Sequence, residues 1–356
     1  MAESTTSTQQ IGVLDQKRRS LLACLRRAPR MSWTDVERVS AIPASTARRW
    51  WREMNEEGIA RLGVELYHPA AQHSLSFVSL RIEPALREDV FRALQRLRSV
   101  VFIEDLLTVT DAVCQVLSSS LPELERRILP HIRAIPGVRK VTVLVASAIH
   151  TTGALWQDAI LEPETIARCQ RIHSLAYPRR SPAPLSPLQR RAISELAFDA
   201  RLSAADLGSR LGISSARAGR LIQSLFGRDD VRFRIGMSPA ALGYPLMATY
   251  YCDVHPESRA ALIEAATTIA RARLVASLIG RPSAVFACYA TDVQDIDRIH
   301  AAMSAAVPEA RIGEVAISTR RRKDHGWIFD STDRIIGFDG GPEWPEKFPG
   351  NGGGAV

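Results

Sequence analysis

The stretch LGSRLGISSARAGRLIQSL (Leu207–Leu225) carries apolar residues at helical spacing on both sides of Gly212. Glycine readily adopts the left-handed backbone conformation that ends a helix, and Ser214, two residues further on, is a preferred cap for the next helix. The apolar residues of both segments fall on one face: Leu207, Leu211, Ile213, Ala218, Leu221 and Leu225. The stretch therefore predicts a helix-turn-helix in which Gly212 makes the turn.

The second helix of this motif directs Ser215, Arg217 and Arg220 away from the apolar face. A helix-turn-helix places its second helix in the major groove of DNA, so these side chains and Ser214 are candidate DNA contacts. A helical hairpin without any DNA role has the same pattern. The apolar segment LQRRAISELAFDA at 188–200 favours the DNA-binding interpretation, because a helix-turn-helix domain needs a third helix.

The chain contains this unit twice. Residues 14–54 align without a gap with residues 185–225, at an offset of 171 positions. At an offset of 172 the parallel continues through three further matched pairs: Pro84 and Pro256, Pro136 and Pro308, and Val143 and Val315. We infer two copies of one unit, at about 14–147 and 185–319.

Both copies have the same predicted order of elements after their helices. Segments at 75–84 and 246–256 are rich in β-branched and aromatic residues and end at a proline, which is typical of strands. A helix, two strands around a tight turn, a second helix and a last strand follow, ending at 147 and 319. This βαββαβ order is that of the ferredoxin-like fold, an antiparallel sheet with two helices on one face. We expect the two sheets to pair within the chain as a pseudo-dimer.

The fold class is therefore α+β, with prolines and glycines marking the connections. Five prolines in and around the sequence between the copies (Pro163, Pro178, Pro182, Pro184 and Pro187) predict a linker without regular structure. The Gly/Pro-rich end predicts disorder. The expected parts are a polar arm (1–13), a helix-turn-helix domain (14–66), a ferredoxin-like domain (67–150), a linker (151–184), a second helix-turn-helix domain (185–238), a second ferredoxin-like domain (239–330) and a disordered tail (331–356).

Positive charge is concentrated in the two helix-turn-helix domains. The net charge of the chain is +8. Residues 14–63 contain 11 Lys and Arg against 6 Asp and Glu, and residues 185–235 contain 9 against 5. The remainder is almost neutral, so the basicity lies where phosphate contact requires it, which favours double-stranded DNA as the partner.

Several other classes of protein lack support in the sequence. Five widely spaced cysteines argue against a disulfide framework or a structural zinc site, and the eight histidines lack metal-ligand spacing. No apolar run approaches the 18 residues of a membrane span, and the N-terminus has no apolar signal core. There is no phosphate-binding glycine loop and no Ser/His/Asp arrangement. We expect a cytoplasmic protein that is not an enzyme and holds no metal or cofactor.

In this order, the motifs resemble those of the Lrp/AsnC (feast/famine) family of transcription regulators. Residues 190–214 resemble the family's opening pattern, and residues 45–66 resemble its recognition helix, Glu-Gly turn and β wing. The resemblance implies two winged helix-turn-helix domains, each followed by a ferredoxin-like domain of the RAM or dimeric α-β barrel type. It also implies a regulator that forms homo-oligomers. Family members usually carry one copy and dimerise, whereas two copies are fused here.

The first copy departs from this pattern at its turn. Ala41 replaces the turn glycine and Pro43 replaces the capping serine, although proline suits the first turn of a helix. One residue of the pair Trp50 and Trp51 is expected to fill the core in place of Leu221, with base stacking as the alternative. The candidate DNA contacts of this copy are Ser45, Thr46, Arg48, Arg49 and Arg52.

The resemblance further implies an amino-acid effector, bound at the turn between the two middle strands. The family carries a glycine there and an aspartate three residues later. The second copy has Gly280 and Ser283, and the first has Thr108 and Asp111, so each copy keeps half of the pattern. One hybrid site built from Gly280 and Asp111 is one hypothesis, and ordinary hairpin residues are the other.

A sister group of enzymes with this architecture decarboxylates sirohaem, and this activity is the alternative function. Such enzymes need basic, His and Tyr side chains on the sheet to hold a substrate with many carboxylates. The middle strands here offer Arg281 and Tyr289 but no histidine. A scaffold without DNA binding is a third hypothesis, which the arginines of both second helices disfavour.

The run TRRRKDHGW (319–327) follows the last predicted strand. Its four successive cations predict either a phosphate-binding segment or a solvated surface run.

Overall fold

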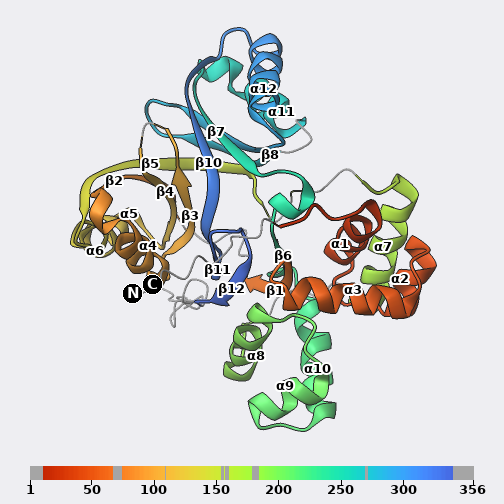
Figure 1. Cartoon of the computed structure of the whole chain (residues 1–356). Coiled ribbons are helices and arrows are strands. Elements are labelled where there is room, and N and C mark those ends of the chain that lie inside the picture. Colours follow the sequence, from red (N-terminus) through yellow and green to blue (C-terminus); the bar gives the residue numbers. More distant parts are fainter. Residues whose placement is uncertain are drawn as a thin grey trace, which may run out of the picture.

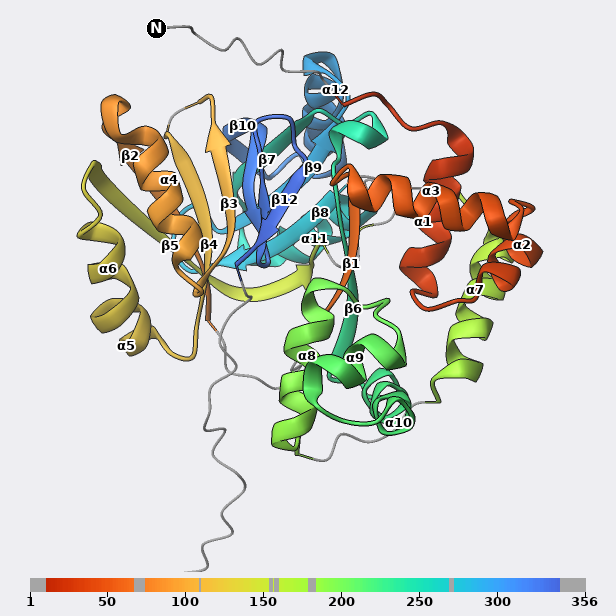
Figure 2. The same ribbon diagram turned by 60° about the horizontal axis from the view of Figure 1, so that its bottom comes forward.

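The computed structural model describes residues 11–66, 74–108, 110–153, 156, 160–178, 184–268 and 272–339. Most of the predicted polar arm (1–13) and of the predicted tail (331–356) lies outside these residues. Figures 1 and 2 show two three-helix units beside a barrel whose outer face carries further helices. Each helix and strand of the first half, from Gln16 to the strand that begins at Ala112, begins 171 or 172 residues before its counterpart in the second half.

Each half of the chain begins with three helices. The apolar face predicted from the sequence is buried in both, and the two units share one hydrophobic core that includes Leu25, Val36, Leu196 and Leu207. The helices are α1 (Gln16–Arg27), α2 (Trp33–Ser40) and α3 (Ala44–Glu56) in the first half, and α8 (Pro187–Phe198), α9 (Ala204–Leu211) and α10 (Ser215–Phe226) in the second.

The turn between the second and third helices has the predicted conformation in both units. Gly212 has φ +69° and ends α9, while the Ser214 side chain accepts a hydrogen bond from the Arg217 N–H. In the first unit Ala41 adopts the same left-handed conformation, with φ 55°, although it carries a β-carbon. The Glu37 carboxylate accepts from the Ala44 N–H at 3.1 Å and so replaces the missing capping side chain at Pro43.

Two equivalent arginines hold the three-helix units together. Arg30 donates to the carbonyls of Ala200 and Leu202, and Arg201 donates to those of Pro29 and Met31 at 2.6 and 3.2 Å. Each guanidinium thus binds the two residues that flank the other arginine. Burial lowers the pKa of Arg201 to about 10, so it stays protonated at neutral pH. Hydrogen bonds from a charged donor to buried carbonyls are among the stronger ones in proteins.

A two-stranded ribbon continues the same symmetry. Strand β1 (Ala60–Leu66) pairs antiparallel with β6 (Val231–Met237), Ala60 opposite Met237 and Leu66 opposite Val231. The resemblance implied a separate wing in each helix-turn-helix domain. The described residues instead contain one strand from each half, and these two strands pair with each other.

The second part of each half contributes four strands to a closed barrel. The strand order β10-β3-β4-β2-β5-β8-β9-β7 closes because β7 also pairs with β10. The first half supplies β2 (Ser74–Ile82), α4 (Arg87–Arg96), β3 (Val100–Leu106), β4 (Ala112–Ser118), α5 (Leu121–Glu123), a π-helical turn (Leu124–Ile128), α6 (Leu129–Arg133) and β5 (Val138–Thr151). The second half supplies β7 (Leu246–Asp253), α11 (Arg259–Thr268), β8 (Ala272–Leu278), β9 (Ala284–Ala290), α12 (Val293–Ala306) and β10 (Arg311–Asp324). Short 3₁₀ turns lie at Pro84–Leu86, Ala240–Leu242 and Pro256–Ser258.

The last strand of each half is longer than predicted, and its extra length closes the barrel. The first part of β5 pairs with β2, and residues 146–151 pair with β8 of the other half. Likewise β10 pairs first with β7 and then, from Ser318 to Asp324, with β3. The expected pairing of the two sheets within the chain is therefore confirmed.

Three apolar layers stabilise the barrel. Helices α4–α6 cover the sheet of the first half through residues such as Phe91 and Ile103, and α11 and α12 cover that of the second half through Phe286 and Ile299. A separate cluster from both halves, which includes Phe77 and Val285, fills the inside.

The predicted linker contains a helix. Residues Pro163–Ala176 form α7, which packs against α1 and α2 and buries Cys169. Pro163 is the first residue of α7, where a missing N–H has no cost, so its presence did not argue against a helix. Tyr177, just beyond α7, packs edge-on against Phe226 of α10 at 5.4 Å between ring centroids. The segment thus bridges the two three-helix units.

The predicted disordered tail also begins with structure. Strands β11 (Trp327–Phe329) and β12 (Ile335–Phe338) form a hairpin on the end of β10, and the Ile335 N–H donates to the Gly58 carbonyl at 2.8 Å. Trp327 is 1% exposed and lies against the β1–β6 ribbon. A β-carbon at Gly63 would come within 2.9 Å of its indole, so a larger residue does not fit there. The disorder prediction was wrong for residues 331–338.

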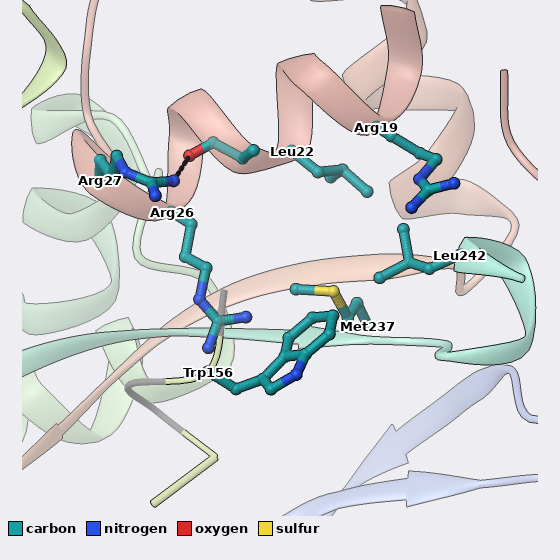
Figure 3. Close-up of a pocket in the computed structure, with 8 residues that line it drawn as sticks. Arg19, Leu22, Arg26, Arg27, Trp156, Met237 and Leu242 are labelled. Atoms are coloured by element: carbon teal, nitrogen blue, oxygen red, sulfur yellow. Dashed lines mark hydrogen bonds between the residues drawn. The ribbon is translucent and has the colours of Figure 1, made fainter. Parts of the chain in front are cut away.

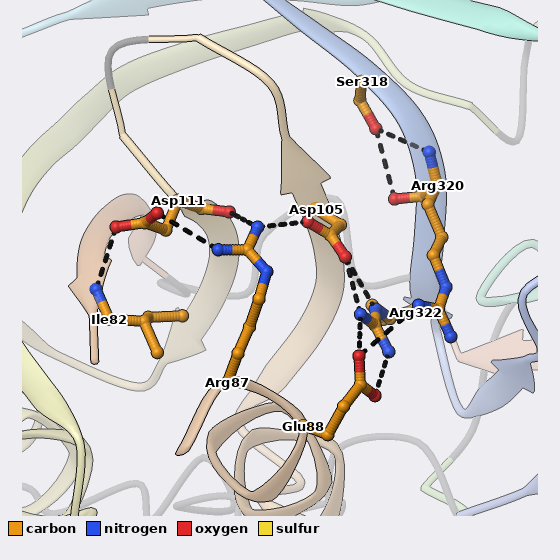
Figure 4. A network of polar contacts seen from close by, with 8 residues as sticks. All are labelled: Ile82, Arg87, Glu88, Asp105, Asp111, Ser318, Arg320 and Arg322. Carbon is orange, nitrogen blue, oxygen red and sulfur yellow. Dashed lines mark hydrogen bonds and ion pairs between the residues drawn. The ribbon is translucent and has the colours of Figure 1, made fainter. Parts of the chain in front are cut away.

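The run 319–327 is neither a solvated surface segment nor a phosphate-binding one. Most of it belongs to β10, and its cations are largely buried. Arg321, Arg322 and Lys323 are at most 8% exposed. Arg322 donates to Glu88 and to Asp105 of the first half, as Figure 4 shows, and these carboxylates offset its charge. Lys323 donates to the carbonyls of residues 95 and 97, and burial lowers its pKa to about 8.

Ala41 offers a test of the turn. We expect Ala41→Gly to stabilise the protein by about 0.5–1 kcal/mol, because glycine relieves the left-handed strain at the cost of some chain entropy. Gly212→Ala is the matched control and should lower the free energy of unfolding by about 1 kcal/mol. A β-carbon at Gly212 would meet no atom within 4 Å, so the cost comes only from the left-handed backbone conformation. Urea unfolding of the full chain measures both. Equal effects of the same sign would contradict the equivalence of the two turns.

Candidate nucleic-acid interface

The candidate DNA contacts of the second half lie together on the outer face of α10. Ser214, Ser215, Arg217 and Arg220 are all exposed, whereas Ala218, Leu221 and Leu225 face the core. The side chain of Ser214 accepts from the Arg217 N–H at 3.3 Å and so fixes the start of the helix. In known helix-turn-helix proteins, the N-terminal end of the second helix contacts the base edges.

The candidates of the first half lie on the corresponding face of α3. Ser45, Arg48, Arg49 and Arg52 are exposed and Thr46 is half-buried. The pseudo-two-fold axis of the ribbon relates α3 to α10, and both helices lie outside the barrel (Figure 1).

The two helices differ in their charge. Arg49 lies 3.6 Å from Glu53 and Arg52 lies 3.9 Å from Glu56, so carboxylates on α3 partly neutralise its arginines. Among the described residues, Arg217 and Arg220 have no carboxylate within ion-pair distance, and α10 itself has no acidic residue. An exposed arginine without a partner keeps its full attraction for phosphate.

One tryptophan of α3 fills the core, as predicted, but it is not the one that corresponds to Leu221. Trp51 is 8% exposed and belongs to the shared core, where it corresponds to Ile222. Trp50, which corresponds to Leu221, is half-buried, and the Arg18 guanidinium lies 5.0 Å from its ring centroid.

The two turns predicted to bind an effector have equivalent structural contacts. In the first half the Ile82 N–H donates to the Asp111 carboxylate at 2.9 Å, and Arg87 donates to the same carboxylate at 3.1 Å (Figure 4). In the second half the Val254 N–H donates to the Ser283 hydroxyl at 3.0 Å. Asp111 and Ser283 therefore cap the same strand position, each within its own half.

The other two turn residues contact the opposite half. The Thr108 hydroxyl accepts from the Ile317 N–H of β10 at 3.1 Å. Next to Gly280, whose φ is +93°, the Ile279 N–H donates to the Val145 carbonyl of β5 at 2.9 Å. These contacts favour the hairpin interpretation of the four residues. Effector binding by Thr108, Asp111, Gly280 and Ser283 stays a prediction.

A cluster of buried arginines lies where the three-helix units meet the barrel, and sequence reasoning missed it. Arg234 of β6, Arg273 of β8 and Arg321 of β10 are each at most 8% exposed and converge on Asp324. The three guanidinium groups hold the pKa of Asp324 far below its usual range. No motif joins these residues, which are 39 or more positions apart except for Arg321 and Asp324.

Within the described residues, no helix combines the length and apolar character needed to cross a membrane. The same residues contain no group of three or more His, Cys, Asp or Glu side chains close enough to hold a metal ion.

No family model matches the chain. It is 29% identical over 142 residues to an uncharacterized HTH-type transcriptional regulator of Pyrococcus abyssi, a match that covers 39% of this chain and 90% of the relative. A regulator with the same description from Pyrococcus horikoshii is 28% identical over 142 residues, again 39% of this chain and 90% of the relative. The chain is thus similar, over two fifths of its length, to proteins described as helix-turn-helix transcriptional regulators.

Among solved structures, the sirohaem decarboxylase NirDL in complex with an iron-uroporphyrin III analogue has a TM-score of 0.54 at 11% identity, over 87% of this chain and 93% of that one. AsnC of E. coli is 15% identical with a TM-score of 0.34, over 43% of this chain and 99% of that one. At this identity, the likeness to NirDL shows a shared fold.

The equivalent position in the second half supplies a control for Asp111. Asp111→Ala should lower the free energy of unfolding by about 1–2 kcal/mol, because the Ile82 N–H loses its acceptor and Arg87 loses one of its carboxylate partners while it keeps Asp105. Asp111→Ser introduces the residue that the second half carries and should recover about half of that loss, since a hydroxyl can still accept from Ile82. Urea unfolding distinguishes the two variants. Equal losses would show that the strand cap contributes nothing.

Proposed function

We propose that this protein is a sequence-specific DNA-binding transcriptional regulator of the Lrp/AsnC type, in which the two halves of one chain replace two subunits. The observation that carries the proposal is the outer face of α10, where Arg217 and Arg220 are exposed and lack ion-pair partners among the described residues. The similarity to helix-turn-helix regulators of Pyrococcus supports it.

The charge difference between the helices supports unequal roles for them. Helix α10 reads most of the sequence, and α3 contributes mainly phosphate contacts through Arg48, whereas Arg49 and Arg52 lie beside glutamates. Because the pseudo-two-fold axis relates two helices of different sequence, the preferred DNA site consists of two unlike half-sites. Control by a small-molecule effector belongs to the same proposal.

A sirohaem decarboxylase activity is the second candidate, because the fold matches that of NirDL over 87% of the chain. The buried arginines and Tyr289 line a cavity of about 20 Å³. One water molecule needs about 10–15 Å³ of such space, so this cavity admits one or two water-sized groups and no tetrapyrrole. Arg281 is exposed and lies outside it. The geometry therefore supports the regulator better than the enzyme.

The DNA proposal is tested on the genomic fragment that the full chain enriches most strongly from fragmented DNA of its source. The double change Arg217→Ala, Arg220→Ala should weaken binding at least about tenfold, since a base-reading arginine contributes roughly 1–3 kcal/mol. It should also lower the slope of log affinity against log salt by about one for each arginine–phosphate ion pair that it removes. Fluorescence anisotropy over a salt series measures both quantities.

Arg92→Ala is the control, because Arg92 is an exposed arginine on α4 of the barrel, where it pairs with Asp89. It should change neither affinity nor salt dependence. Arg49→Ala should have a smaller effect than Arg220→Ala, although the two residues occupy equivalent positions. If the α10 double variant binds the fragment as tightly as the wild type, α10 is not the reading helix.

A further inference from the structure

Two cysteines from distant parts of the sequence meet between α1 and α7. Cys24 lies on α1 and Cys169 on α7, 145 positions further along the chain. The two helices pack against each other, and both cysteines are 0% exposed in the core that the three-helix units share. Their thiols are hydrogen-bonded to each other, and no disulfide joins them. Because the two sulfur atoms already meet, a disulfide between them requires little movement of the backbone.

A cation lies beside this thiol pair. Arg27, one turn after Cys24 on α1, interacts electrostatically with both sulfur atoms and donates to the Ala23 carbonyl at 3.2 Å (Figure 3). The hydrogen bond from Cys24 and the charge of Arg27 lower the pKa of the Cys169 thiol against the effect of burial. The pKa of Cys24 is raised by the hydrogen bond that it donates and by burial. Cys169 is therefore the nucleophile of the pair, because the thiolate and not the thiol attacks.

The other three cysteines lie in the apolar layers of the barrel. Cys114 of β4 lies in the layer under α4–α6, whereas Cys252 of β7 and Cys288 of β9 lie in the layer under α11 and α12. Burial raises the pKa of Cys114 and of Cys252 to about 12, so both thiols stay protonated at neutral pH. Buried protonated thiols are inert, and these two serve as internal controls.

Helix α7 is held in place by few buried side chains. Of its 14 residues, all of which the structure describes, only Cys169 is buried. Elements with few buried contacts open locally much more often than the whole protein unfolds. Local opening of α7 therefore gives a small oxidant access to Cys169, and closing returns this side chain to Cys24.

We propose that Cys24 and Cys169 form a reversible disulfide when the protein reacts with a peroxide. The Cys169 thiolate attacks one oxygen of hydrogen peroxide, so that a sulfur–oxygen bond forms, the oxygen–oxygen bond breaks, and hydroxide leaves and takes up a proton. The Cys24 sulfur then attacks the resulting sulfenic acid, the sulfur–sulfur bond forms, and the hydroxyl group leaves with the Cys24 proton as water. Two thiols thereby lose two electrons and two protons, and the peroxide is reduced to two molecules of water.

The disulfide fixes α7 on α1 and so strengthens the connection between the two three-helix units. Besides the contact of Tyr177 with Phe226, His173 of α7 packs edge-on against Phe233 of β6 at 5.7 Å between ring centroids. The cross-link therefore holds both of these contacts in place. The inference does not depend on DNA binding.

The test treats the full chain with hydrogen peroxide under conditions that convert a free cysteine peptide completely to its disulfide. The protein is then denatured in an alkylating reagent. We expect the wild type to lose two of its five thiols and to give a tryptic cross-link between the peptides of Cys24 and Cys169. Dithiothreitol should restore both thiols. Retention of all five thiols, or cross-links that join any other pair, would overturn the proposal.

Single variants test the separate roles of the two cysteines. Cys24→Ala should leave Cys169 as a sulfenic acid that dimedone traps, because the resolving thiol is missing. Cys169→Ala should keep all of its remaining thiols. Cys252→Ala is the matched control and should still form the cross-link. A sulfenic acid at Cys24 in place of Cys169 would contradict the assignment of the nucleophile.

Arg27→Met should slow the loss of thiols, because it removes the cation beside Cys169. Arg168→Met is its control, since Arg168 precedes Cys169 on α7 but pairs with Glu164. Equal rates of thiol loss in these two variants would contradict the role of Arg27. If a variant does not fold, the thiol count and the cross-linked peptides of the wild type decide alone.

Discussion

The pairing of each long last strand with the opposite half is the constraint on which the structure depends. A four-stranded ferredoxin-like sheet leaves two edges with unpaired backbone groups, and exposed edges promote aggregation. Residues 146–151 of β5 cover the edge at β8, and the second part of β10 covers the edge at β3, so the barrel has no free edge among these eight strands. Neither half can complete this arrangement without the other.

The same symmetry operates at the three-helix units, where the β1–β6 ribbon and the paired contacts of Arg30 and Arg201 repeat it. The C-terminal hairpin then breaks it. Trp327 lies against one side of the ribbon, and residues 333–335 bind Arg321, Ser238 and the Gly58 carbonyl. The two halves therefore share a fold but not an environment, which agrees with the different charge balance of α3 and α10.

The features that could be predicted were those encoded by neighbouring residues in the sequence. Gly212 and Ser214 sufficed for the helix-turn-helix, and alternation with proline stops indicated the strand order. Ala41 shows how strongly packing reinforces such a turn, because it keeps the left-handed conformation without a glycine. The predicted last strands ended at residues 147 and 319, whereas their continuations to Thr151 and Asp324 pair with the other half and not with their own sheet.

The buried charges escaped prediction for a related reason. The run from Arg320 to Lys323 resembles a solvated surface until Glu88 and Asp105, more than 200 positions earlier, are seen to lie beside Arg322. Arg273 is likewise indistinguishable from an exposed strand residue by sequence alone. Of the candidate interface, the outward arginines of α10 followed from helical periodicity, but the glutamates that neutralise α3 mattered only once their distances were known.

The presence of both halves in one chain has a kinetic and an evolutionary consequence. A pair of separate subunits dissociates on dilution and can exchange partners with related proteins, whereas tethered halves meet at a high effective concentration whatever the amount of protein in the cell. Each half therefore always pairs with the other half of its own chain. Each half is also free to accumulate its own substitutions without appearing twice in the assembly, so Pro43 or the glutamates of α3 alter one half only.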